Sequence, residues 1–268
     1  MSRLEQILAQ KRLELDFTHL AEGGEELGVR AGGRGRDVKD ALARPEGAPM
    51  RLIAEVKFKS PSAGPLSRKL DAGARAVAYA KAGARMVSVL CDEAFFGGSY
   101  GDVAAARKAL DDQGLVLPVL AKEFIIDPVQ LVWASRHGAD AALVIARIVD
   151  ERMLRVLIEQ ARALGLEPFV EVVTEAERDA ALEAGAAVIG VNARDLDTLV
   201  MDREGAARVI AGIPRDRVAV HLSGLGSPSA VAAIAAGRAD AALIGEALMR
   251  VDDPSPVLRE FVSAAERR

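Results

Sequence analysis

The chain has 268 residues, of which 50% are hydrophobic and 28% are charged, and its formal net charge is −4. This composition is typical of a globular protein, and the length fits one large domain or two smaller ones. Lys and Arg are scattered, so we expect no binding to nucleic acid, and the apolar runs are far shorter than the roughly 18 residues of a membrane span. A single cysteine, Cys91, excludes an intramolecular disulfide framework and favours a cytoplasmic location.

The N-terminal residues 1–14 (MSRLEQILAQKRLE) predict an amphipathic helix rich in charge, without the apolar core of a signal peptide. Residues 22–36 are rich in Gly and in charged side chains, which is typical of a loop, and we do not interpret them as a domain linker. We therefore predict one domain over 1–268, in which residues 1–50 form a helical extension and loop and residues 51–268 form the main fold.

From residue 51 onward, short apolar segments alternate with amphipathic segments. The apolar segments predict eight strands, at Leu52–Lys57, Met86–Leu90, Leu117–Ala121, Ala141–Ile145, Pro168–Val172, Ala187–Val191, Arg217–His221 and Ala241–Ile244. The amphipathic segments predict helices near 72–82, 101–110, 128–137, 151–164, 175–184, 203–212, 227–236 and 254–267. Eight such pairs, with strands that are apolar throughout, predict a (βα)8 TIM barrel of the α/β class. An open doubly wound sheet is the alternative, and the lack of an edge-strand signal disfavours it.

The first predicted strand runs into a charged loop, with the sequence IAEVKFKSPSAG over residues 53–64. Glu55 and Lys57 share one face of this strand, because side chains two residues apart point the same way. If that face points inward, two opposite charges enter the core together, which is rare unless the charges are paired or functional. This strand therefore predicts part of an active site, with Ser60 in the loop that follows it.

Polar residues also follow the other predicted strands, although surface charge would be expected on the helices. In a TIM barrel the carboxyl ends of all strands face the side that carries the active site. These positions hold Asp92, Glu93, Lys122, Arg147, Glu171, Asn192, Arg194, Ser223 and Gly245. One pair alone could be a structural ion pair, but the convergence of several such residues predicts a catalytic site.

Lys122 and Glu171 are the candidates for proton transfer. A lysine in an apolar pocket has a lowered pKa, which suits a general acid or a Schiff base; the alternative is a lysine that only pairs with Glu55 or Glu171. Glu171 suits a general acid or base, and its alternative is a partner for a neighbouring lysine. For Arg147 we favour a structural counter-ion over a catalytic role.

The last two strands are followed by small residues that fit a phosphate group. The segment 223–227 (SGLGS) and Gly245 each precede a helix, where backbone N–H groups can approach an anion closely; the alternative is plain helix entry with Ser227 as the N-cap. Phe96 and Phe124 fit either the wall of a site for an aromatic substrate or simple packing. The three histidines lack metal-ligand spacing and no nucleotide-binding motif is present, so we expect neither a metal nor a cofactor.

These sequence blocks resemble one family, the indole-3-glycerol phosphate synthases of tryptophan biosynthesis. The resemblance covers nearly the whole chain and rests on IAEVKFKSPSAG, SVLCDEAFFGGSY, LAKEFIIDPVQL, EPFVEV, IGVNARDL and IGEALMRVDDP, in this order. It implies a carboxy-lyase that closes the indole ring of 1-(2-carboxyphenylamino)-1-deoxyribulose 5-phosphate, with loss of carbon dioxide and water and without a cofactor or metal. The expected partner is this small phosphorylated molecule, and we expect a monomer or at most a weak dimer.

The resemblance also implies roles for individual residues. Lys122 would be the general acid at the ribulose carbonyl, Lys57 would contact the carboxylate and phosphate side of the substrate, and Glu171 would serve the later dehydration. Glu55 and Asn192 would orient the substrate and the lysines. Ser60, Arg194, Ser223, Gly224, Gly245 and Glu246 (through its backbone N–H) match the phosphate region, and Phe96 and Phe124 match the apolar wall for the anthranilate ring.

The chain departs from the family pattern at Leu222, where a Glu is usual, at Arg147, where a Lys is usual, and at Cys91, where a Thr is common. We predict that activity is retained, because the residues assigned to proton transfer are all present. Two alternatives remain. A sugar-phosphate isomerase on the same barrel would need neither an aromatic wall nor paired strand lysines, and a ligand-binding paralogue with reduced activity is motivated by Leu222.

Overall fold

The computed structural model describes residues 2–21, 36–60, 64–195, 197–198 and 200–266, the last five residues of the first range by backbone alone. The loop predicted at 22–36 lies outside the described residues except for Arg36, and so does the side chain of His19.

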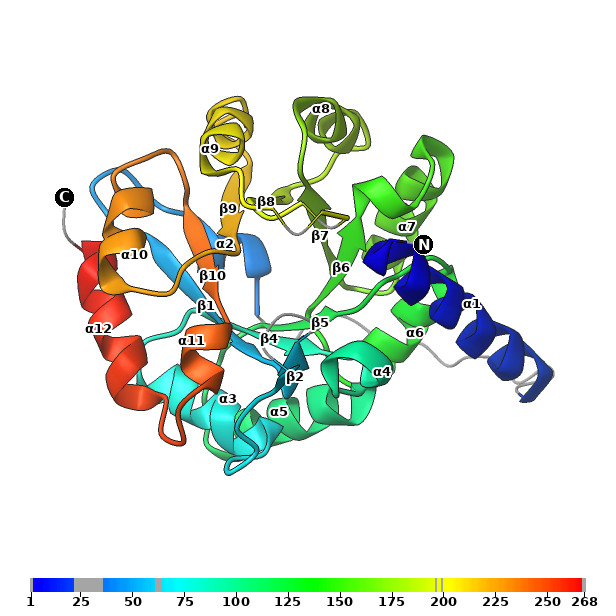
Figure 1. The fold of residues 1–268 in the computed structure, drawn as a ribbon, viewed down its shortest axis with the longest axis horizontal. Helices are drawn as coiled ribbons and strands as arrows, with labels where there is room; N and C mark the ends of the chain where they lie inside the picture. Colours follow the sequence, from blue (N-terminus) through cyan, green and yellow to red (C-terminus); the bar gives the residue numbers. More distant parts are fainter. Residues whose placement is uncertain (1, 22–35, 61–63, 196, 199, 267–268) are drawn as a thin grey trace.

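Eight parallel strands form a closed barrel in the order β1-β10-β9-β8-β7-β6-β5-β4 (Figure 1). The strands are β1 (Arg51–Val56), β4 (Met86–Leu90), β5 (Val119–Lys122), β6 (Ala141–Ile145), β7 (Glu167–Val172), β8 (Val188–Asn192), β9 (Val218–Leu222) and β10 (Ala241–Ile244). Because β1 pairs with both β4 and β10, the sheet closes on itself. The predicted TIM barrel is confirmed, and the open sheet is wrong.

Helices surround the barrel on its outer side (Figure 1). They are α3 (Ala72–Lys81), α5 (Tyr100–Asp112), α6 (Pro128–Arg136), α7 (Glu151–Ala163), α8 (Glu175–Glu183), α9 (Arg203–Ala211), α10 (Pro228–Ala235) and α12 (Ser255–Glu266). Side-chain caps fix where they begin: Asp71 accepts the backbone N–H of Ala74, and Thr174 forms a reciprocal capping box with Glu177. These caps set the ends of the loops that leave the strands, and those loops carry the site.

Two helices precede the barrel. Helix α1 (Arg3–Ala21) is longer than the predicted 1–14, and it lies over the right side of the barrel in Figure 1. Helix α2 (Val38–Leu42) lies at the amino end of β1, where Arg51 Nε donates to the carbonyl of Ala43 at 3.3 Å. Leu4 and Ile7 of α1 and Leu42 of α2 pack with the residues inside the barrel.

The loops at the carboxyl ends of the strands contain short elements that the sequence did not predict. They are the antiparallel pair β2 (Lys59–Ser60) and β3 (Gly64–Pro65), α4 (Glu93–Phe96), the 3-10 helix η1 (Ala146–Ile148) and α11 (Glu246–Met249). Each is too short for an apolar period to reveal it. Five predicted strands also differ from the observed ones by one or two residues, because a short apolar run does not show which residue pairs last.

The apolar core has two parts. One lies between strands and helices and takes outward-facing side chains such as Ala54 and Val56; the other lies inside the barrel and takes inward-facing ones such as Ile53. The strand period of two continues this alternation, so Glu55 is the last inward-facing residue of β1 and reaches the mouth of the barrel. Among the described residues, no helix is both long and apolar enough to cross a membrane.

Candidate active site

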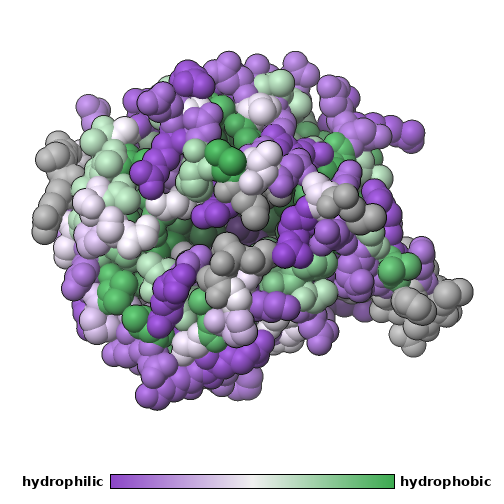
Figure 2. Space-filling view, in the orientation of Figure 1, coloured by the Kyte–Doolittle hydropathy of each residue, from purple (hydrophilic) through white to green (hydrophobic). Residues whose placement is uncertain are grey.

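A cavity of about 440 Å³ opens at the carboxyl ends of the barrel strands. Figure 2 shows a hollow near the centre of the face, with hydrophobic side chains inside it and mostly hydrophilic ones around it. The residues that line the cavity include the residues to which the sequence assigned catalysis or substrate binding, namely Glu55, Lys57, Ser60, Phe96, Lys122, Phe124, Glu171, Asn192, Arg194, Ser223, Gly224, Gly245 and Glu246. The fold therefore brings these residues together, whereas Asp92, Glu93 and Arg147, which also follow predicted strands, do not line the cavity.

Glu55 pairs with two lysines at the mouth of the barrel. Lys57 Nζ donates to Glu55 Oε1 at 2.8 Å, and Lys122 Nζ lies 3.4 Å from Glu55 Oε2. The lysine side chains are 15% and 19% exposed, whereas that of Glu55 is 3% exposed. We call these three residues the Lys122 cluster. It holds two ammonium groups for one carboxylate, and both ammonium groups reach the cavity.

The surroundings of Lys122 keep it protonated. Burial alone would lower its pKa, but the carboxylates of Glu55 and Glu171 outweigh burial and raise the pKa above 10.5. The lowered lysine pKa expected from the sequence is therefore wrong, because the pocket that buries the lysine also contains two carboxylates. Burial would likewise raise the pKa of Glu55, but Lys57 and Lys122 lower it to about 2. At neutral pH the cluster thus contains an ionised carboxylate and a protonated lysine that can act as an acid.

Glu171 and Asn192 lie on the neighbouring strands β7 and β8. Asn192 Nδ2 donates to Glu171 Oε1 at 2.9 Å, and Asn192 Oδ1 accepts the backbone N–H of Arg194 at 3.0 Å. The amide of Asn192 therefore orients the Glu171 carboxyl group and also fixes the start of the loop that carries Arg194. Glu171 is 2% exposed, so this hydrogen bond lies within the protein rather than in bulk solvent.

The loops after β9 and β10 bring the backbone close to the cavity. Gly245 lies against Glu55, and a Cβ at this position would overlap the Glu55 carboxylate. Ser223 has a φ of +70°, and it is the one non-glycine residue with positive φ in the part of the chain that the structure describes. This conformation is strained for Ser, and His221 Nε2 lies 3.1 Å from the Ser223 carbonyl oxygen, where it supports the turn. Backbone N–H groups that come this close to a cavity can bind an anion such as a phosphate group.

Phe96 and Phe124 form an apolar side of the cavity. Phe96 is the last residue of α4, and Phe124 lies two residues beyond the end of β5. Their ring centroids are 5.9 Å apart, within the range of favourable aromatic pairs. We call this pair the aromatic wall. It offers a flat apolar surface on the cavity side that carries the loops after β4 and β5.

Arg147 acts as a counter-ion. Its Nε lies 3.0 Å from Glu177 Oε1, and its guanidinium lies 2.6 Å from Asp195 Oδ2. The hydrogen bond from Arg147 holds the pKa of the Asp195 carboxyl well below its usual range. Arg147 therefore connects η1, α8 and the loop after β8, which agrees with the structural role favoured from the sequence.

Leu222 ends β9 with its side chain inside the barrel. It is 1% exposed, packs in the same apolar cluster as Phe169 and Leu243, and lies opposite Asn192 in the pairing of β8 with β9. The position next to Asn192 is therefore apolar, and no carboxylate joins Glu171 there.

Some residues of the cavity were missed by the sequence analysis. Arg3, Leu4 and Ile7 of α1 line it, as do Glu123 and Arg250. A signal existed for α1, because Leu4 and Ile7 are three residues apart and share one face of the helix. The sequence did not show which surface this apolar face covers.

The remaining candidates are inert. Cys91 is buried, and burial raises the pKa of its thiol. His137 Nδ1 lies 2.7 Å from the carbonyl oxygen of Trp133. In the described part of the chain, no group of three or more His, Cys, Asp or Glu side chains could hold a metal ion.

Comparison with known proteins identifies one family. Residues 4–261 match the model of the family described as indole-3-glycerol phosphate synthase. Indole-3-glycerol phosphate synthase 1 of Streptomyces coelicolor is 40% identical over 266 residues, which cover 99% of this chain and 97% of the relative. The indole-3-glycerol phosphate synthase of Mycobacterium sp. strain KMS is 42% identical over 228 residues, which cover 85% of this chain and 81% of the relative.

Solved structures share the fold at low sequence identity. A 3-hexulose-6-phosphate synthase superposes with a TM-score of 0.63 at 16% identity, covering 80% of this chain and 99% of the other. Thiamine phosphate pyrophosphorylase from Pyrococcus furiosus superposes with a TM-score of 0.61 at 14% identity, covering 86% and 98%. At this identity the similarity shows a common barrel and carries no information about the reaction.

Proposed function

Because the chain belongs to the indole-3-glycerol phosphate synthase family, we propose that the cavity at the mouth of its barrel is the site of this family's reaction. The chain is a carbon–carbon lyase of tryptophan biosynthesis, and its substrate is a small phosphorylated molecule. One observation carries the proposal. Two strand-end lysines, a carboxylate, an aromatic pair and two loops of close backbone all line the same cavity.

The substrate, 1-(2-carboxyphenylamino)-1-deoxyribulose 5-phosphate, has three parts that match three regions of the cavity. Its aromatic ring would lie against the aromatic wall, and its carboxylate would meet the ammonium group of Lys57. Its phosphate would bind at the opposite side, where the candidates are Ser60, Arg194, Ser223, Gly224, Gly245 and the backbone N–H of Glu246. The ribulose carbonyl would then lie between these ends, near Lys122 and Glu171.

Lys122 would donate a proton to the ribulose carbonyl oxygen while the ring carbon that bears the carboxylate bonds to the carbonyl carbon. The raised pKa of Lys122 supports this role, because an acid must hold its proton until the reaction takes it. Carbon dioxide then leaves, and the hydroxyl group made from the carbonyl leaves as water. In this dehydration Glu171 would take a proton from the carbon next to the nitrogen and pass it to the leaving hydroxyl group, so that water departs and the double bond of the indole ring forms. Asn192 would keep the carboxyl group of Glu171 oriented.

Two alternatives are less well supported. A sugar-phosphate isomerase would need no aromatic wall and no pair of strand lysines, and both line the cavity. An inactive ligand-binding paralogue would be free to lose its proton-transfer groups, whereas Lys122, Glu55 and Glu171 are all present and mutually close.

The test is to supply the anilino-ribulose phosphate and follow the fluorescence of the indole product. Lys122→Ala and Glu171→Gln should each lower turnover by about 10²- to 10⁴-fold, the usual contribution of one proton-transfer group. Lys108→Ala, at an exposed ion pair with Asp112 on α5, is the matched control and should leave turnover unchanged. Failure of the parent protein to form product would overturn the proposal, and so would a Lys122→Ala variant within threefold of the parent.

The proposal also covers the setting in which the enzyme works. We infer that the chain acts as one domain over 1–268, because α1 contributes to the same cavity as the barrel strands. We also infer a cytoplasmic monomer, because α1 and the barrel of a single chain supply both the aromatic wall and the proton-transfer groups of the cavity. Sedimentation at working concentration would test the monomer, and a dimer would contradict it.

A further inference from the structure

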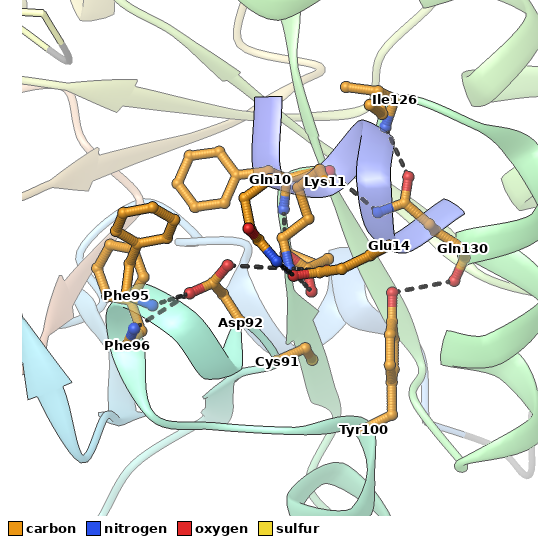
Figure 3. Close-up of polar contacts among 12 residues, drawn as sticks. Gln10, Lys11, Glu14, Cys91, Asp92, Phe95, Phe96, Tyr100, Ile126 and Gln130 are labelled. Carbon is orange, nitrogen blue, oxygen red and sulfur yellow. Dashed lines mark hydrogen bonds and ion pairs between the residues drawn. The ribbon is translucent and has the colours of Figure 1, made fainter. Parts of the chain in front are cut away.

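A buried lysine of the N-terminal helix lies next to the aromatic wall. The side chain of Lys11 on α1 is 4% exposed, and its Nζ lies 2.9 Å from Asp92 Oδ2, 3.2 Å from Glu123 Oε2 and 2.8 Å from Glu14 Oε2. Figure 3 shows Lys11 between Glu14 of its own helix and Asp92 of the barrel. We call Lys11, Glu14, Asp92 and Glu123 the Lys11 cluster. Asp92 and Glu123 come from two different loops, so one ammonium group connects α1 to both.

Asp92 connects the ammonium group of Lys11 to Phe96. It follows β4 as the N-cap of α4, and its Oδ1 accepts the backbone N–H groups of Phe95 at 2.6 Å and Phe96 at 3.1 Å (Figure 3). The second oxygen of the same carboxylate meets Lys11. Asp92 is 0% exposed, so no water competes for either oxygen. Through Asp92, Lys11 of α1 therefore helps to fix the position of the Phe96 backbone.

Glu123 connects Lys11 to the other ring in the same way. It follows Lys122 directly, and its Oε1 accepts the backbone N–H of Phe124 at 2.7 Å while its Oε2 meets Lys11. Both rings of the aromatic wall are therefore attached to loops whose carboxylates share one ammonium group. The ion pairs of Asp92 and Glu123 run to Lys11, whereas Lys122 pairs with Glu55.

Helix α1 is itself part of the cavity beside these rings. Leu4 and Ile7 line the cavity and pack in the same apolar cluster as Phe124, and the Arg3 guanidinium lies 5.9 Å from the centroid of the Phe95 ring. Residues 4, 7 and 11 occur at helical spacing on one face of α1. That face therefore presents two apolar residues to the cavity and one ammonium group to the loops below it.

We propose that Lys11 is a positioning residue, which fastens α1 to the loops after β4 and β5 and so shapes the half of the cavity that receives the aromatic ring of the substrate. The inference rests on the proposed function for the identity of that ring. Removing the ammonium group would leave the carboxyl groups of Asp92 and Glu123 buried without their shared cation, and a buried polar group that loses its charge partner destabilises the structure around it. The two loops would then separate, and α1 would lose its contact with the wall.

The test is Lys11→Met, which keeps the length of the side chain and removes its charge. We expect KM for the anilino-ribulose phosphate to rise about tenfold with kcat within threefold, because the proton-transfer groups are untouched. A general loss of folded protein would lower the apparent kcat and leave KM unchanged, so the two effects are distinguishable. Lys108→Met, which breaks an exposed pair with Asp112, is the matched control. Lys11→Arg should recover most of the loss, because it restores the charge.

Two further measurements separate this inference from the proposed function. By calorimetry, Lys11→Met should weaken binding of indole-3-glycerol phosphate about tenfold and leave glycerol 3-phosphate, which has no ring, unaffected. Hydrogen exchange of the α1 amides should become faster in the same variant. If the parent protein neither turns over nor binds the indole compound, the proposed function fails, and faster α1 exchange would still support the fastening role. Unchanged KM together with unchanged hydrogen exchange of α1 would overturn the inference. Equally weakened binding of indole-3-glycerol phosphate and glycerol 3-phosphate would also overturn it.

Discussion

The Lys122 cluster and the Lys11 cluster use the same residue types in opposite proportions. The first has two ammonium groups around Glu55, and its lysine side chains are 15% and 19% exposed toward the cavity. The second has one ammonium group among three carboxylates, and Lys11 is 4% exposed. Glu55 and Glu123 are equally buried, at 3% side-chain exposure, so burial alone does not distinguish the two sites.

The pKa values of the two carboxyl groups differ in direction because the balance of charge differs. Burial would raise both; the two lysines nevertheless lower the pKa of Glu55 to about 2, whereas Lys11 does not overcome burial at Glu123, where the pKa is raised to about 7. An excess of ammonium groups open to a cavity favours proton donation to a ligand. An excess of carboxylates around one enclosed ammonium group favours a fixed attachment between elements.

The largest expected effect comes from breaking the Lys122 cluster at its carboxylate. Glu55→Gln should lower turnover about a thousandfold, or about 4 kcal/mol in activation free energy, because both lysines lose the group that orients them. The pKa of Lys122 should also fall, since Glu55 is the larger of the charges that raise it, and the basic limb of the pH–rate profile should move to lower pH. Steady-state kinetics from pH 6 to 11 measures both effects.

The same substitution in the Lys11 cluster is the control. Glu123→Gln should keep kcat within threefold of the parent, because Glu123 pairs with Lys11 and not with the lysines of the Lys122 cluster. Equal losses of turnover in Glu55→Gln and Glu123→Gln would show that the two clusters do not have separate roles.

The pH dependence of stability should have opposite signs at the two clusters. The pKa of Glu123 is raised from 4.5 to about 7 in the folded protein, so the native state binds the extra proton in this window and stability is lost as pH rises through it. This loss amounts to about 3 kcal/mol. The pKa of Glu55 is lowered to about 2, so its contribution is present above pH 4.5 and is lost as pH falls toward 2.

Urea unfolding of the parent and of Glu123→Gln from pH 4.5 to 8 tests whether the free energy of unfolding falls with rising pH because of Glu123. The parent should lose about 3 kcal/mol more than the variant over this range. Glu183→Gln, on the exposed surface of α8, is the control and should follow the parent. If the free energies of unfolding of the parent and of Glu123→Gln changed with pH in parallel, the excess of carboxylates in the Lys11 cluster would not raise the pKa of Glu123 as we state.

A smaller effect is expected from adding a carboxylate near the Lys122 cluster. Leu222→Glu would place one beside Asn192, at a position that is 1% exposed and close to Glu171. We expect turnover to stay within tenfold of the parent, or about 1.4 kcal/mol, because the proton-transfer set is complete without it. A gain above tenfold would show that Leu222 impairs the enzyme, and Leu222→Gln would separate the effect of charge from that of shape.

The comparison also explains which parts of the molecule could be predicted from the sequence. The barrel was predictable because its strands are continuous apolar runs, and Glu55 and Lys122 stood out as charges at the ends of such runs. The Lys11 cluster was not predictable. Lys11 lies in a helix, where a lysine is ordinary. It is 112 residues away from Glu123 in the sequence, and only the fold shows that the two side chains are in contact.

The direction of the lysine pKa was unpredictable for a similar reason. The sequence shows that Lys122 ends an apolar strand, and burial by itself lowers a lysine pKa. Whether burial or a neighbouring carboxylate prevails depends on distances such as the 3.4 Å between Lys122 Nζ and Glu55 Oε2. Distances of this kind follow from the register of strands β1, β4 and β5, which the apolar pattern does not specify.

The smallest expected effect concerns the third carboxylate of the Lys11 cluster. Glu14 is one helical turn from Lys11, and its side chain is 39% exposed, so solvent screens its attraction to the ammonium group. Glu14→Gln should lower the free energy of unfolding by less than about 0.5 kcal/mol and leave KM unchanged, as measured by urea unfolding and steady-state kinetics. A rise in KM comparable to that of Lys11→Met would mean that the charge of Glu14 holds the lysine in place, and the attachment of α1 would then depend on its own helix rather than on Asp92 and Glu123.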